Sequence, residues 1–192
     1  MSERINELTD KIAKLERQLL DEFDKQQKKF NYRLVGKKIQ FEQEILEAHR
    51  KLKRSMLPWL FSSSLRNILS APFIYSMVFP IVFFDLTITC SQHICFRLYG
   101  IRRVRRSDYI ALDRHHLAYL NGIEKFNCLY CGYGSGVVAY SREVIARTEQ
   151  YWCPIKHARR VVGSHRNHNK FVNYGEGEDY QKQLIKLRND LK

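Results

Sequence analysis

Three cysteines and a histidine in the C-terminal half have the spacing of metal ligands. Cys128 and Cys131 form a CxxC pair, and Cys153 and His157 follow after 21 intervening residues. The turn of a CxxC pair directs both thiolates toward one ion, and three sulfurs with one imidazole suit tetrahedral zinc. Four protein ligands leave no position for water, so the pattern predicts a closed structural zinc site with no catalytic residue. Iron or an iron–sulfur cluster is the alternative metal, and buried free thiols are the alternative without a metal.

The residues around these cysteines carry two resemblances. The Cys-Gly and Cys-Pro steps are similar to the knuckles of rubredoxin-like and zinc-ribbon proteins, although His157 stands one residue later than the fourth cysteine of a ribbon. His165 and His168 are candidate replacement ligands. The runs 119–131 (with NCLYC) and 148–159 (with EQYWCPIKHAR) resemble a family of small uncharacterised proteobacterial proteins. That resemblance implies a bacterial origin and no particular activity.

A single carboxylate stands inside the most apolar part of the chain. Between Asn67 and Phe96, Asp85 is the one charged residue, and an ionisable group there marks a candidate polar site because burying it unpaired is costly. Thr89 and His93 follow at successive spacings of four residues, which places all three side chains on one helix face. Two interpretations are open. The three residues form an intramembrane polar site, or the helix packs on its own domain with Asp85 paired to an arginine.

A basic run follows the apolar segment, within a chain of net charge +13. Such a surplus favours anionic lipid headgroups or nucleic acid as partners. Headgroup contact is the preferred prediction, at about 1 kcal/mol per basic residue near an anionic surface, because the run adjoins apolar sequence. No interleaved aromatic platform accompanies it, so a nucleic-acid or ribosome-associated zinc protein is the second alternative. The predicted headgroup contacts are Arg102, Arg103, Arg105 and Arg106.

The segment 56–106 predicts membrane association. It begins with an aromatic patch at 58–61, and its apolar centre exceeds the roughly 20 residues of one membrane-crossing helix but is too short for two. Both flanks are basic, and basic flanks stay in the cytoplasm. We therefore expect a re-entrant helix–break–helix that enters and leaves one membrane face, with its turn near Pro80. A single crossing helix and a pair of buried helices in a soluble protein are the alternatives.

Residues 1–55 predict a coiled coil. Apolar residues recur at spacings of three and four along one helical stripe, which needs a partner helix to be buried in water. We expect one long helical region over 3–55, with a bend at Gly36, that binds a protein partner or a second copy. The stripe consists of Ile5, Leu8, Ile12, Leu15 and Leu19.

Residues 107–192 predict a small metal-stapled helical domain. The patterns favour helices over 108–126, 137–151 and 179–191, a Gly-rich turn over 128–136 and a loop over 163–175. The fold class is thus mostly α. No apolar leader opens the sequence, so we expect the cytoplasmic face of a bacterial inner membrane. The expected role is a non-enzymatic, membrane-associated zinc-binding scaffold or assembly component. The alternative is a monotopic membrane enzyme that uses Asp85 or the His115/His116 pair as its acid or base.

Overall fold

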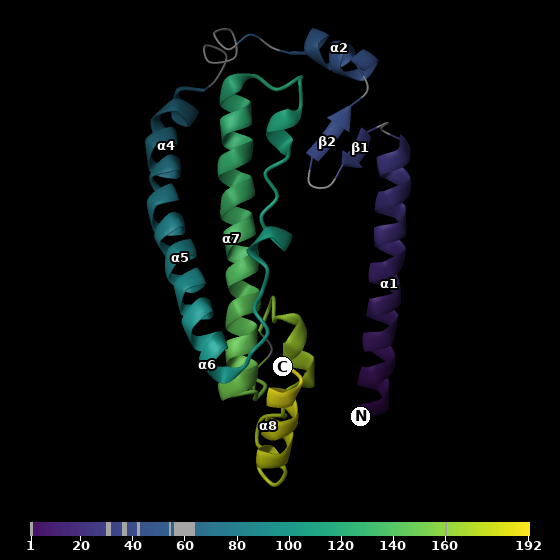
Figure 1. Cartoon of the computed structure of the whole chain (residues 1–192), viewed down its shortest axis with the longest axis vertical. Coiled ribbons are helices and arrows are strands. Elements are labelled where there is room, and N and C mark those ends of the chain that lie inside the picture. The colour runs from purple at the N-terminus through teal and green to yellow at the C-terminus, as the bar shows by residue number, and fades with distance from the viewer. Residues whose placement is uncertain are drawn as a thin grey trace. The chain divides into compact units, whose positions relative to one another are not determined.

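The computed structural model describes residues 2–29, 32–35, 38–41, 43–53, 55, 64–159 and 161–192. These residues are mostly helical, as predicted (Figure 1). They form two compact units, where the sequence predicts three domains: one of Met1–Ser55 with His115–Asn121, and one of Met56–Arg114 with Gly122–Lys192. The predicted aromatic patch at 58–61 and the predicted bend at Gly36 lie outside the described residues.

The first unit contains two helices and a strand pair, so the prediction of one helical region over 3–55 is wrong. Helix α1 spans Ser2–Lys29 and helix α2 spans Gln43–Lys51. Between them, β1 (Tyr32–Val35) pairs antiparallel with β2 (Lys38–Phe41). Apolar and polar residues alternate along β2 and through the first three residues of β1, and this period of two favours a pleated sheet over a helix. The imidazole of His49 packs edge-on to the ring of Tyr119, with centroids 5.2 Å apart.

The second unit begins with a long apolar helical segment that does not turn back on itself. Helix α4 (Leu65–Ser76) and helix α5 (Val78–Ser91) are separated only by Met77, whose backbone is right-handed helical. Pro80 lies in the first turn of α5, and its missing N–H would otherwise bond to the carbonyl of Ser76, where α4 ends. The helical hydrogen bonding is therefore interrupted while the direction continues (Figure 1). The predicted re-entrant turn at Pro80 is wrong.

A π-helical turn, η1 (Gln92–Phe96), and a short helix, α6 (Arg97–Tyr99), complete this segment. Gly100 ends it in the left-handed conformation (φ 69°), which glycine adopts without strain. Among the described residues, one helical segment, the 35 residues Leu65–Tyr99, is long and apolar enough to cross a membrane by length and composition. Only 6% of its most apolar window is buried within the chain.

The helix predicted over 108–126 is wrong over 108–121, and only residues 122–126 are helical, at the start of a later helix. Residues 101–114 form a largely irregular return segment. It contains the 3₁₀ turn η2 (Arg106–Asp108), and a second such turn, η3 (Arg114–His116), follows at its end. Val104 contacts Gln92, and Arg106, two residues later, contacts Asp85. Ile110 then lies against Gly136 and Ala111 against Gly132 of another helix. As the segment advances, its contacts move toward the N-terminus of each helix, so it runs antiparallel to both.

Helix α7 (Gly122–Trp152) is a single helix of 31 residues that runs parallel to α4 and α5. Its early residue Asn127 meets Tyr75, Tyr133 meets Asp85, and Tyr151 stacks on Tyr99. The prediction of a Gly-rich turn over 128–136 is wrong, whereas the predicted helix over 137–151 is confirmed as part of α7.

The glycines of α7 serve close packing. A Cβ added at Gly132 would lie 3.3 Å from the Ala111 carbonyl oxygen, and one at Gly136 would lie 2.8 Å from the Cα of Ile110. The return segment therefore lies directly against the backbone of α7, where any larger side chain would separate them.

The remaining chain folds onto the C-terminal half of α7. A 3₁₀ helix, η4 (Arg166–Lys170), occupies part of the predicted loop, and α8 (Tyr180–Asn189) confirms the predicted last helix. Ile155 and Val172 form an isolated parallel bridge. A buried apolar cluster joins η1, the return segment, α7 and the C-terminus through Phe96, Ile101, Val104, Tyr140, Val144 and Leu191.

Candidate functional site

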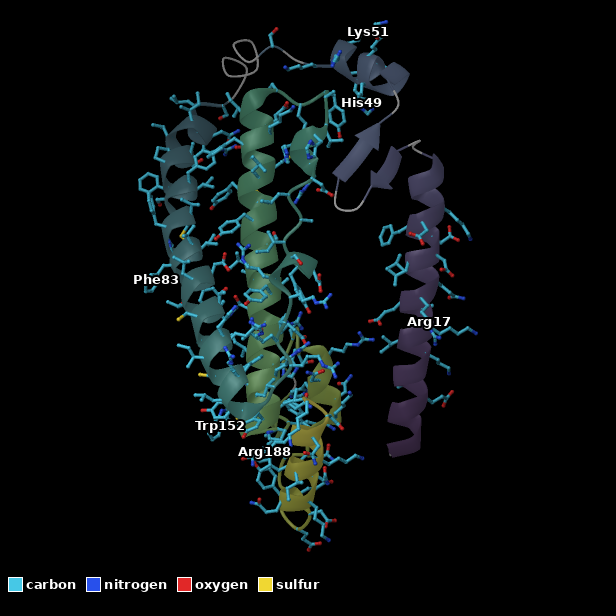
Figure 2. The ribbon with its side chains drawn as sticks, in the orientation of Figure 1. Arg17, His49, Lys51, Phe83, Trp152 and Arg188 are labelled. Carbon is cyan, nitrogen blue, oxygen red and sulfur yellow. The ribbon has the colours of Figure 1, made fainter. Side chains whose placement is uncertain are left out.

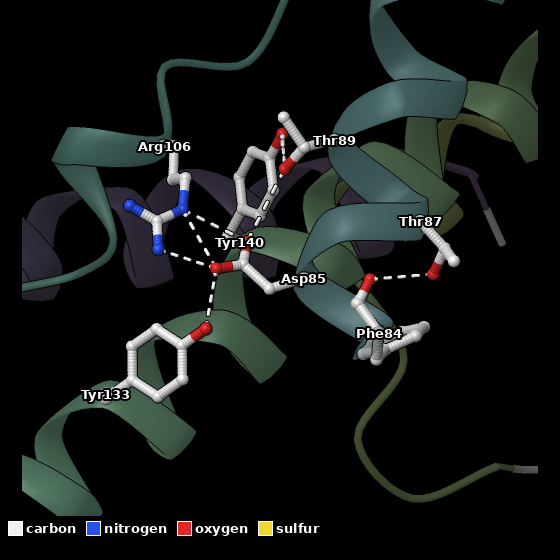
Figure 3. A network of polar contacts seen from close by, with 7 residues as sticks. All are labelled: Phe84, Asp85, Thr87, Thr89, Arg106, Tyr133 and Tyr140. Carbon is white, nitrogen blue, oxygen red and sulfur yellow. Dashed lines mark hydrogen bonds and ion pairs between the residues drawn. The ribbon is translucent and has the colours of Figure 1, made fainter. Parts of the chain in front are cut away.

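The best-defined polar cluster surrounds Asp85, on the inner face of α5. Asp85 is a buried charged residue on a helix that has no distinct polar face. Arg106, from the return segment, donates from Nε to both carboxylate oxygens (3.0 and 3.2 Å) and from Nη2 to Oδ2 at 2.6 Å. The Tyr133 hydroxyl of α7 donates to Oδ2 at 2.8 Å. Figure 3 shows the carboxylate between these two donors. Asp85 thus joins three parts of the unit.

A second set of hydrogen bonds extends the cluster along α5. The Gln92 amide accepts from the backbone N–H of Val104 at 2.7 Å and donates to the Tyr140 hydroxyl at 2.8 Å. The Thr89 hydroxyl lies 3.4 Å from both Asp85 Oδ1 and the Tyr140 hydroxyl. Gln92 is buried, so its side chain supplies the hydrogen bonds that the irregular backbone at Val104 would otherwise lack.

The electrostatics of the cluster keep Asp85 ionised. The hydrogen bond from Arg106 lowers the pKa of the Asp85 carboxyl against the opposing effect of burial, and the Tyr133 hydrogen bond lowers it further. Burial raises the pKa of Tyr133, so this phenol stays protonated and continues to donate. A carboxylate that already accepts from two side chains and has a lowered pKa is a poor general base at neutral pH. The arrangement is suited to holding helices together.

The predicted polar site is thus formed in part. Asp85 and Thr89 come together, but the exposed His93 directs Nδ1 to the Thr89 backbone carbonyl oxygen at 3.0 Å. Of the two interpretations of Asp85, the structure shows pairing with an arginine. That arginine is Arg106, which the sequence predicts as a lipid-headgroup contact, whereas the sequence predicts no role for Tyr133 or Gln92. Their side chains fall at positions where α7 and η1 face the return segment, which periodicity alone does not reveal.

The other predicted headgroup contacts lie on the surface of the unit. Arg102, Arg103 and Arg105 are all exposed. Arg102 donates from Nη2 to the backbone carbonyl oxygen of Lys192 at 3.2 Å, so its guanidinium lies at the chain's C-terminus. Of the predicted headgroup contacts, Arg103 and Arg105 therefore remain as exposed positive charges beside the end of the apolar segment.

The structure does not bring the four predicted zinc ligands together. Cys128 and Cys131 lie within α7, whereas Cys153 and His157 follow its end. A helix rises about 1.5 Å per residue, so roughly 30 Å separates the two pairs. No turn directs the CxxC thiolates to one ion, and the expectation of a shared four-ligand site is corrected. Within the described parts of the chain, no group of three or more His, Cys, Asp or Glu side chains is placed to hold a metal ion.

The candidate replacement ligands lie near His157 but have other contacts. The His168 ring stands 5.8 Å from that of His157 and 5.9 Å from that of His165, between centroids. His165 Nε2 pairs with the Glu149 carboxylate at 2.8 Å. Burial lowers the pKa of His168, which favours its neutral form. These three histidines therefore pack η4 against the end of α7.

The alternative acid–base pair lies elsewhere. The rings of His115 and His116 are 3.9 Å apart in the 3₁₀ turn η3. No described hydrogen bond links either imidazole to a hydroxyl or thiol that it could activate, and an activated nucleophile requires such a contact. Comparison with protein-family models, with curated proteins and with solved structures finds no match for this chain, so its own residues carry the functional argument.

Proposed function

We propose that this protein is a non-enzymatic scaffold bound to the surface of a membrane, at the cytoplasmic face of a bacterial inner membrane. The outer face of Leu65–Tyr99 is the membrane-binding surface, and α1 is the part that recruits a protein partner or a second copy. The observation that carries the proposal is the exposure of large apolar side chains along this face.

That face is predominantly apolar. Its most exposed apolar side chains remain 65 to 78% exposed, and they recur at the helical spacing of one side. Phe83 extends from the side of α5 that faces away from α7 (Figure 2). An apolar surface of this extent on a single chain marks a membrane or protein contact. Its most exposed members are Leu65, Phe73, Phe79, Phe83, Leu86 and Leu98.

The return segment favours a helix that lies along the membrane surface over one that crosses it. Residues 101–114 run beside α5 and α7 with charged side chains and little regular backbone hydrogen bonding. Irregular backbone in the hydrocarbon core costs several kcal/mol for each unsatisfied group, about 4–8 by transfer to an alkane. A helix in the interface buries only its outer face, so the return segment stays on the aqueous side.

Arg103 and Arg105 lie just after this helical segment and are exposed, so they could contact anionic headgroups from the same side. A helix that lies along the membrane surface also accounts for the basic residues at both ends of the apolar segment, since neither end leaves the cytoplasmic side. The enzymatic alternative gains no support from Asp85, whose carboxylate is occupied by Arg106 and Tyr133.

We expect the double variant Phe79→Ser/Phe83→Ser to bind anionic vesicles at least about tenfold more weakly than the wild type, because two exposed aromatic rings no longer enter the interface. Co-sedimentation of the full chain with vesicles of phosphatidylethanolamine and phosphatidylglycerol measures the partition. Val162→Ser is the matched control, because Val162 is an exposed apolar residue outside the helical segment. Equal partition of the double variant and this control would contradict the proposed face.

Depth measurements separate a surface helix from a crossing one. Single tryptophans at positions 73, 83 and 98, in a chain with Trp59 and Trp152 replaced by Phe, sample roughly 37 Å of helix axis. We expect brominated lipids to quench all three at a similar, shallow depth. A deep position 83 between two shallow ends would identify a crossing helix and would contradict the surface arrangement.

A further inference from the structure

Helix α1 presents an apolar stripe that the described residues of its own unit leave uncovered. Leu8, Ile12, Leu15 and Leu19 are between 52 and 63% exposed. They lie at spacings of three and four residues, so they form one line over residues 8–19 of the 28-residue helix. The opposite side of the helix is charged, with Lys14, Arg17, Asp21 and Asp24 at its centre.

The residue types along the stripe specify the kind of partner. In heptad positions, Ile12 falls at a, Leu8 and Leu15 at d, and Leu19 at the next a. Isoleucine at a with leucine at d favours two parallel strands over three or four, because each position then packs best against its own copy. The stripe is thus complementary to itself.

The charges beside the stripe favour the same arrangement. Lys11 occupies position g, and Glu16 occupies position e of the following heptad. In a parallel, in-register pair these positions face each other, so the ammonium of one copy meets the carboxylate of the other, and symmetry repeats the contact. Lys11 Nζ also pairs with Glu7 of its own helix at 2.6 Å, at the solvent-exposed margin where an intermolecular pair would form.

We propose that α1 binds α1 of a second copy as a parallel, in-register two-stranded coiled coil, with Lys11 and Glu16 facing each other across the pair. The inference rests on the proposed scaffold function and names its partner. Pairing would place two membrane-binding faces on one particle, which strengthens membrane attachment through multivalency without any new lipid contact.

A charge exchange between two copies tests the arrangement. Lys11→Glu alone places glutamates at facing g and e positions, and Glu16→Lys alone places lysines there. Each variant should pair with itself less than the wild type does. When the two variants are co-expressed as full-length chains with different tags, every facing pair becomes attractive. We expect the mixed pair to exceed its statistical share by about tenfold in affinity capture from detergent extracts.

The matched control exchanges the same charges at outward c positions. Lys14→Glu and Asp21→Lys should mix at the statistical ratio. Statistical mixing of the Lys11 and Glu16 variants, as an antiparallel pair would give, overturns the inference. So does a wild-type chain that fails to capture its own copy, as expected if α1 binds another protein. Leu8→Asp/Leu15→Asp should abolish capture, and capture that persists in this variant overturns the inference too.

Vesicle binding by each variant separates this inference from the function on which it rests. Unpaired variants should still bind vesicles through Leu65–Tyr99. Loss of self-capture with retained vesicle binding supports both proposals. Absence of vesicle binding in every chain, wild type included, would reject the scaffold while leaving the charge exchange to decide the pairing.

Discussion

Gly136→Ala is expected to destabilise the second unit by about 1–3 kcal/mol, although alanine is the better helix former by about 1 kcal/mol. The new Cβ would lie 2.8 Å from the Cα of Ile110 and 2.9 Å from the Tyr109 carbonyl oxygen. Both are backbone atoms, so a rotamer change cannot relieve the overlap and the return segment must move. At about 2–4 °C per kcal/mol for a chain of this size, the melting temperature should fall by several degrees.

Gly134→Ala is the matched control on the same helix. Its Cβ would meet only the Ile81 Cδ1 atom, at an ordinary 3.5 Å, so the gain in helix propensity should dominate. Circular dichroism melts give the two stabilities, and hydrogen exchange of residues 101–114 locates the change. Equal melting temperatures for the two variants would mean that the return segment does not press against α7 as described.

Asp85→Ala is expected to cost about 2–4 kcal/mol of unfolding free energy. Arg106 and Tyr133 would both lose their acceptor, and hydrogen bonds to a charged group contribute about 1.5–3 kcal/mol. The Arg106 side chain is 45% exposed and can turn to water, which places the cost below that of a fully buried pair. Denaturant unfolding of the full chain in detergent measures the change.

The dependence of this effect on pH follows from the direction of the pKa shift. The pKa of Asp85 is lowered in the folded chain, so its contribution to stability is fully present above the unfolded value near 3.9 and is lost as pH falls through the folded value. Wild type and Asp85→Asn should therefore differ by a constant amount between pH 5 and 7. Their stabilities should converge below about pH 4.

A double-mutant cycle separates the ion pair from general damage. If Asp85→Ala and Arg106→Gln remove the same interaction, the double variant should be more stable than the sum of the single changes predicts, by about 1–2 kcal/mol. Strict additivity, together with a stability difference that persists unchanged at pH 3, would show that Asp85 acts through something other than its charge.

Several features were predictable because they depend on local pattern. The apolar stretch around Asp85 exceeds the roughly 20 residues of one membrane-crossing helix, and the last helix shows an unbroken apolar stripe ending at Leu191. The pairing of Asp85 with an arginine was also foreseeable, because the cost of burying an unpaired carboxylate leaves few other arrangements. Which arginine pairs with it depends on the path of residues 101–114, and no periodicity encodes that path.

The zinc ligands and the turn over 128–136 could not be judged from local pattern. Glycines beside cysteines are typical of a metal knuckle, but the same glycines suit a helix that another segment approaches closely. Gly132 and Gly136, four residues apart, lie on one helix face against Ala111 and Ile110. Tertiary contact therefore decides between turn and helix there, and a helix carries Cys131 far from Cys153.

The parallel order of α5 and α7 has a consequence for biosynthesis. Two neighbouring parallel helices cannot form a helical hairpin as they leave the ribosome, because the return segment must first be made. Roughly fifty residues follow Tyr99 before α7 is complete, which takes about 3–10 s at ordinary translation rates. During that time the apolar segment Leu65–Tyr99 lacks its inner partner, and Asp85 lacks the full set of hydrogen bonds that Arg106 and Tyr133 donate to it. A nascent chain in this state exposes a large apolar surface, so we expect it to bind a bilayer or a chaperone before its own fold is complete.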